Sequence, residues 1–122
     1  MTVQRGEPSV PVVPQPPMTR DALRSAVRQL DLARLGEFDT ELGEAFDRAV
    51  QMSSTTPMRL FLEKWATVVA ILRYPDRARR LHAAEQELAD VTISEDAFRQ
   101  ARTAIREVLD AASREVLPDT HR

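Results

Sequence analysis

The chain of 122 residues contains no cysteine. This absence excludes disulfides, thiolate metal sites and thiol nucleophiles, and it suits a reducing cytoplasm. Glycine is also scarce, and its three residues are not clustered, so a glycine-rich loop that cradles phosphates is excluded. The formal net charge of −2 does not favour a protein whose surface as a whole neutralises nucleic-acid phosphates.

Long apolar runs are missing as well. Glu63, Lys64 and Arg73 interrupt the most apolar stretch, residues 61–75, which is therefore unsuited to a membrane span of about 18–20 residues. The first residues also lack the apolar run and the cleavage site of a signal peptide. We therefore expect a cytoplasmic protein, and its length predicts one domain with a single modest core.

The sequence is rich in helical periodicity from Met18 onwards. Apolar residues recur at steps of three and four, and no stretch alternates with a period of two. The prediction is an all-α fold, with four main helices plus a short N-terminal helix in a single bundle over residues 19–118, followed by a frayed tail at 119–122. Caps and prolines place the helices after Thr19, at about 32–52 behind an Asp31 cap, after Thr56, at about 76–90, and from Thr92 or Ser94 to about Leu117.

Residues 1–18 form a separate, proline-rich arm. Pro8, Pro11, Pro14 and Pro17 fall at every third position, which is the repeat of a polyproline II helix. Such a segment can dock in an aromatic groove of another protein. It can also be a disordered, semi-rigid lead-in to the bundle, and we favour this second interpretation.

The third helix is apolar on two sides. Its main face contains the single tryptophan, Trp65, and is large enough that we expect it to be core. A second face lies well away from the first, and we expect the other helices to cover it only in part. Leu60, Ile71 and Tyr74 would then be available to a partner or to a second copy in a weak homodimer. The narrow strip predicted to face water consists of Arg59, Glu63, Ala66 and Ala70.

Two stripes of like charge are also present. The acidic stripe consists of Glu37, Glu41 and Glu44, which recur at steps of four and three on the second helix. The basic stripe lies on the fourth helix and just before it. Both stripes can be solvated or can pair with each other, at about 0–1 kcal/mol for an exposed pair. If the stripes are functional, the acidic stripe would contact a basic partner protein. The basic stripe would bind nucleic acid, but the nearby Glu85 and Glu87 argue against that interpretation. The arginines of the basic stripe are Arg73, Arg77, Arg79 and Arg80.

Residues with catalytic or metal-binding potential are few. His82 and Glu85 have the one-turn spacing found in di-metal helical bundles, but the second histidine, His121, lies in the tail. No serine or threonine has a plausible base beside it. The sequence therefore predicts no catalytic residue, no metal site and no cofactor, and a protein that is not an enzyme.

Three segments together resemble a known family. EFDTELGEAFDRA with the Thr-Pro cap that follows it, FLEKW and YPDRARRL are similar to an uncharacterised family of small all-helical actinobacterial proteins, domain of unknown function 6247. The resemblance covers about Thr19 to Leu88. Members can lie beside genes for toxins of the RelE/ParE type, which implies an antitoxin-like partner protein. The matching positions are Glu37, Phe38, Glu41, Leu42, Phe46, Phe61, Leu62, Trp65 and Pro75.

The residues and the resemblance together predict a non-enzymatic protein-binding module, antitoxin-like, that neutralises a basic toxin. The first alternative is a dimeric DNA-associated regulator that binds DNA through the arginine stripe. The second is a homodimeric protein without a separate ligand.

Overall fold

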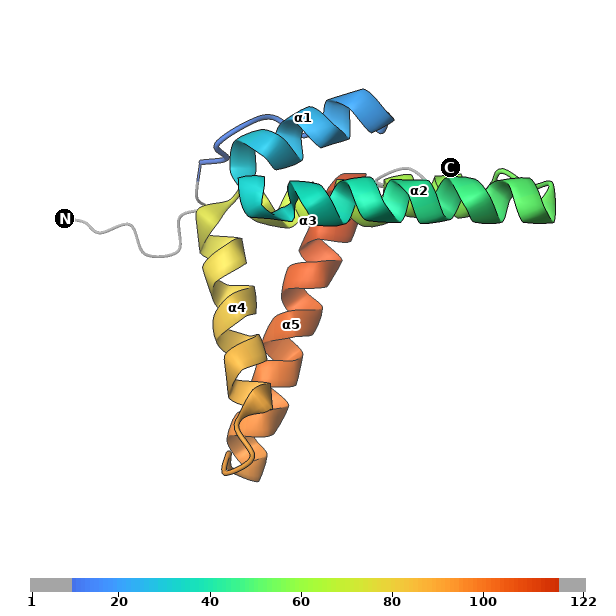
Figure 1. Ribbon diagram of the computed structural model, residues 1–122. Coiled ribbons are helices and arrows are strands. Elements are labelled where there is room, and N and C mark those ends of the chain that lie inside the picture. Colours follow the sequence, from blue (N-terminus) through green and yellow to red (C-terminus); the bar gives the residue numbers. More distant parts are fainter. Residues whose placement is uncertain (1–9, 117–122) are drawn as a thin grey trace.

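The computed structural model describes residues 10–116 (Figure 1). Its regular elements in that range are helices, with no strand, so the predicted all-α fold is confirmed. None of these helices is long and apolar enough to cross a membrane. The elements are α1 (Arg20–Leu30), the 3₁₀ turn η1 (Leu32–Arg34), α2 (Leu35–Met52), α3 (Thr56–Leu72), α4 (Pro75–Ala89) and α5 (Glu95–Val116).

Local sequence signals account for most of the helix ends. The Thr19 hydroxyl accepts a hydrogen bond from the Ala22 amide at 3.3 Å and so caps α1. Pro57 and Pro75 stand in the first turns of α3 and α4, where the missing N–H would have no helical partner. Asp31, the predicted cap of the second helix, makes no side-chain capping bond. The chain passes through η1 there, and α2 starts three residues later than expected.

The start of α5 distinguishes the two predicted caps. Ser94 is the cap, because its hydroxyl accepts a hydrogen bond from the Ala97 amide at 3.1 Å. Thr92 instead donates its amide and its hydroxyl to the Asp90 carboxylate, at 2.9 and 2.7 Å. These bonds close the loop between α4 and α5, and they hold the pKa of Asp90 below its usual value.

Helix α3 is central and contacts each of the other four helices. Its fully buried Trp65 lies edge-on to Phe38 of α2, with ring centroids 5.2 Å apart. Phe61 of α3 also lies edge-on to Phe38, with ring centroids 5.0 Å apart. Leu23 and Val27 of α1 complete this main core. A smaller core lies on the opposite side of α3, where Ala70 and Ile71 pack against Val108 and Ala112 of α5.

The helices form two parts that share α3. In Figure 1, α1, α2 and α3 pack together as one group, and the α4–α5 hairpin runs away from that group. The end of the α2–α3 hairpin, where α2 meets α3, projects beyond both α1 and α5. Phe46, Val50 and Met52 near that end of α2 are exposed.

Two expectations about burial were wrong. Ala66 and Ala70, predicted to face water, are buried, because the N-terminal arm and α5 cover that strip. Ile71 is also buried, with 7% of its surface exposed. Conversely, Phe46 and Met52 belong to the apolar stripe of α2 but are 59% and 58% exposed. They lie near the projecting end, where α2 extends beyond α1 and α5.

The described part of the N-terminal arm is bound to α3. The Val12 amide donates to the Arg73 carbonyl at 2.7 Å, and the Gln15 side-chain amide donates to the Ala66 carbonyl at 3.0 Å. The Arg73 guanidinium in turn donates to the Val13 carbonyl at 3.3 Å. Residues 10–17 are therefore not the solvated lead-in that the prolines suggested. The remainder of the arm, residues 1–9, and the tail from residue 117 lie outside the described residues.

Candidate protein-binding site

The predicted partner-binding residues separate into two groups in the structure. Ile71 and Tyr74 lie at the C-terminal end of α3, next to α4 and α5. Ile71 is covered by α5 and is therefore not available to a partner. Tyr74 is half-buried, and its ring is covered by the guanidinium groups of Arg73 and Arg77, whose central carbons lie 4.7 and 4.2 Å from the ring centroid.

The four arginines of the basic stripe all have carboxylate partners within the chain. Glu115 of α5 accepts hydrogen bonds from Arg73 at 2.7 Å and from Arg77 at 2.5 Å. Burial alone would raise the pKa of Glu115, but these bonds outweigh it and hold that pKa below its ordinary value. Arg79 pairs with Asp76 and Arg80 with Glu107. The basic stripe therefore joins α3, α4 and α5 and does not pair with the acidic stripe of α2.

The second group, on α2 and α3, surrounds one groove. Glu41, Glu44 and Leu60, which the sequence singled out for different reasons, line the same hollow of about 530 Å³ between the two helices. The floor is apolar, and the rim carries charges of both signs. The full lining is Glu41, Glu44, Ala45, Arg48, Met52, Thr56, Pro57, Leu60, Phe61 and Lys64. This groove, defined by those residues, is the candidate site.

The inner end of the groove is a fixed polar cluster. The Lys64 ammonium donates to both oxygens of Glu41 at 2.8 Å, and the Trp65 indole N–H donates to one of them at 3.0 Å. Burial would raise the pKa of Glu41, but the hydrogen bonds from Lys64 and Trp65 outweigh it and lower that pKa. Glu37 lies 4.0 Å from the same ammonium. Lys64 therefore neutralises much of the acidic stripe from within the chain.

The outer end of the groove is apolar and open. Met52 of α2 and Leu60 of α3 are 58% and 56% exposed, and they stand on opposite sides of the groove. Glu44 lies between the two ends, and its carboxylate forms no ion pair or hydrogen bond with any other residue in the range 10–116. The arrangement offers two large apolar contacts and one free carboxylate to a ligand that lies along the groove.

Met52 continues the apolar spacing of α2 in the sequence, whereas Arg48 was not singled out. A signal for the exposure of Met52 was present in the helix lengths. Helix α2 has 18 residues and α1 has 11, so α1 cannot cover the whole apolar stripe of α2. Arg48 gave no signal, because its place on the rim depends on how α2 packs against α3.

The chain was compared with protein-family models, with curated proteins and with solved structures, and none of them matches it. The assignment of the candidate site therefore rests on the geometry of this chain alone. Among residues 10–116 no three histidine, aspartate or glutamate side chains stand close enough together to hold a metal ion. His82, considered above as a ligand, has its ring nitrogen 3.4 Å from the Gln86 amide nitrogen.

Proposed function

We propose that the protein is a non-enzymatic protein-binding module that receives a helical segment of its partner in the groove between α2 and α3. The observation that carries this proposal is the exposure of Met52 and Leu60 on the two sides of one groove. Large apolar side chains that line a concave surface are typical of sites that bind an amphipathic helix. A polar rim around such residues is also typical of protein interfaces.

The chemistry of the groove specifies the partner segment. It should carry apolar side chains at steps of three and four, to contact Met52 and Leu60. It should also carry a lysine or arginine opposite Glu44, the carboxylate on the rim that has no partner among the described residues. A basic toxin, as the family resemblance implies, would supply the cation opposite Glu44. The toxin-neutralising role rests on that resemblance, whereas helix binding rests on the groove.

The alternative of nucleic-acid binding draws no support from the arginine stripe. Each of its four guanidinium groups is engaged by a carboxylate of the same chain, and binding a phosphate would require exchanging that partner.

The test compares partners recovered from the native host by the tagged full-length chain and by two variants. Leu60→Glu places a charge on the groove wall. Leu32→Glu is the matched control, because Leu32 is 65% exposed but lies on η1, away from the groove. A protein that binds the wild type and the control but is lost with Leu60→Glu, and that rebinds when purified, supports the proposal. Equal recovery by both variants would contradict it.

A further inference from the structure

Gly43 stands in the middle of α2, where glycine costs about 1 kcal/mol relative to alanine. Nothing in the described chain requires a glycine there. Its backbone is helical, and a Cβ atom built on it would meet no atom within 4 Å. The missing side chain therefore leaves open space on the outer surface of α2.

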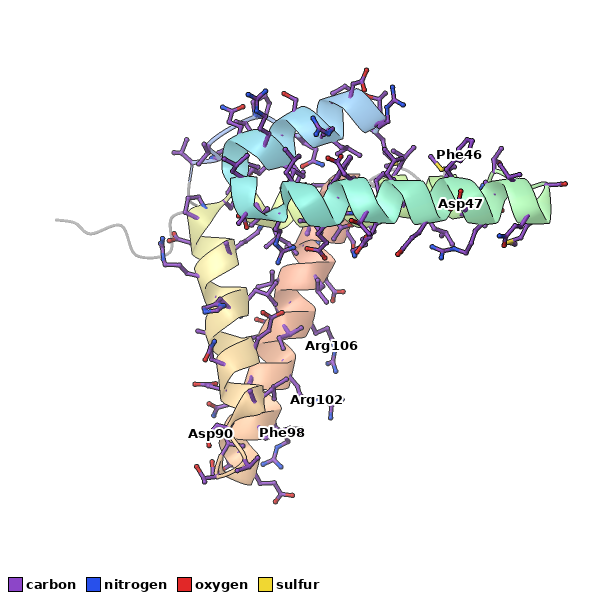
Figure 2. The ribbon with its side chains drawn as sticks, viewed as in Figure 1. Phe46, Asp47, Asp90, Phe98, Arg102 and Arg106 are labelled. Carbon is purple, nitrogen blue, oxygen red and sulfur yellow. The ribbon has the colours of Figure 1, made fainter. Side chains whose placement is uncertain are left out.

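That space is part of a hollow of about 550 Å³, separate from the groove between α2 and α3. Arg20 at the start of α1, Leu42 and Met58 contribute to its lining. Phe46 also lines it, one turn after Gly43, and is 59% exposed; Val50 follows one turn later at 62%. Figure 2 shows Phe46 projecting from α2 beyond the start of α1, with Asp47 on the same free stretch of helix.

We propose that this face binds a second copy of the chain, with the two α2 helices antiparallel and Phe46 of each copy seated in the hollow above Gly43 of the other. A two-fold contact requires a surface that is complementary to itself. An exposed aromatic ring and a side-chain-sized vacancy lie three residues apart on one helix and meet that requirement. When the two α2 helices run antiparallel and their two-fold axis lies midway between Gly43 and Phe46, each Phe46 ring lies opposite Gly43 of the other copy.

The charges around the hollow favour the same arrangement. In this crossing Asp47 of one copy lies opposite Leu42 of the other, which lines the same hollow as Arg20. Asp47 has no partner among residues 10–116, and Arg20 pairs only with the exposed Asp21, an interaction of little energetic consequence. Two Arg20–Asp47 pairs would therefore form across the dimer. This second surface leaves the groove between α2 and α3 free, so the inference is independent of the proposed function.

The first experiment is sedimentation velocity of the full chain over a range of concentrations. We expect the wild type to dimerise and Gly43→Leu to remain monomeric, because leucine fills the hollow. Gly36→Leu is the matched control: Gly36 also lies in α2 with no atom within 4 Å of its Cβ position, but in the antiparallel pairing it falls beyond the end of the partner's α2. Both substitutions favour the helix, so neither should lower the melting temperature.

A charge reversal tests the orientation. Asp47→Arg should weaken the dimer, since it sets two arginines against each other, and adding Arg20→Asp should restore it with the pair reversed. A wild type that is monomeric at every concentration would overturn the proposal. So would a dimer that persists in Gly43→Leu, or one that Asp47→Arg weakens and the double variant does not restore.

Discussion

Trp65 is the residue that joins the core to the candidate site. Its ring is fully buried against Phe38, and its indole N–H holds Glu41 at the inner end of the groove. We expect Trp65→Ala to lower the free energy of unfolding by about 3–5 kcal/mol, because a large cavity opens between α2 and α3. Urea denaturation followed by circular dichroism measures this value. A loss below about 1 kcal/mol would show that the ring is not part of the core.

Glu115 is a residue that makes the stability depend on pH. It holds Arg73 and Arg77 together, and we expect Glu115→Gln to cost about 2 kcal/mol at neutral pH, the range for hydrogen bonds to charged groups. Because its pKa is lower in the folded protein than the ordinary value of 4.5, its contribution is present above pH 4.5 and is lost as the pH falls through the folded pKa.

Unfolding free energies measured from pH 7 downwards test this assignment. The wild type and Glu115→Gln should differ at neutral pH and converge below pH 4.5 as Glu115 becomes protonated. Glu41, whose pKa is also lowered, remains in both proteins and serves as the common background. A constant difference across the whole pH range would mean that the charge of Glu115 does not stabilise the fold.

At the scale of elements, the N-terminal arm acts as a strap along α3. Deleting residues 1–17 removes the bonds made by Val12, Val13 and Gln15 and uncovers Ala66, and we expect a loss of about 2 kcal/mol. The loss is moderated because two buried atoms of this contact, Gln15 Oε1 and Arg73 Nε, have no hydrogen-bond partner. Thermal melting of this deletion, with deletion of residues 1–9 as control, measures the effect. Equal melting temperatures for the two deletions would show that residues 10–17 do not stabilise α3.

Element boundaries could be predicted from the sequence better than element surroundings. The Thr19 cap and the prolines at 57 and 75 act within one or two turns, so they identify helix starts without knowledge of the fold. The cover over Ala66 and Ala70 comes from residues far away in the sequence. A helical wheel shows that these alanines share a strip, but it cannot show that an extended proline-rich segment lies on it.

At the scale of the whole molecule, the α2–α3 hairpin belongs to the core at one end and projects at the other. Phe38 at the start of α2 is fully buried, whereas Phe46, Val50 and Met52 near its end are exposed. The periodicity of α2 predicted a continuous apolar stripe correctly, but the pattern is the same whether the cover comes from this chain or from another. Only the packed structure shows where the cover ends.

The candidate site could be predicted only in pieces for the same reason. Glu41, Glu44 and Leu60 each had a signal in the sequence, but their meeting in one groove depends on how α2 packs on α3. Lys64 of α3 lowers the net negative charge of the acidic stripe, because its ammonium group pairs with Glu41 of α2. A stripe defined on one helix does not include charges contributed by its neighbour.

The most direct test of the central claim, that the projecting hairpin binds a partner through its groove, is the dissociation constant of the purified native partner. Isothermal titration should be performed with the wild type, Leu60→Glu and Leu32→Glu, after equal melting temperatures have been established. Losing one buried leucine contact of about 1.5–3 kcal/mol predicts a Kd at least about tenfold higher for Leu60→Glu, with no change for Leu32→Glu. The same Kd for all three proteins would contradict the claim.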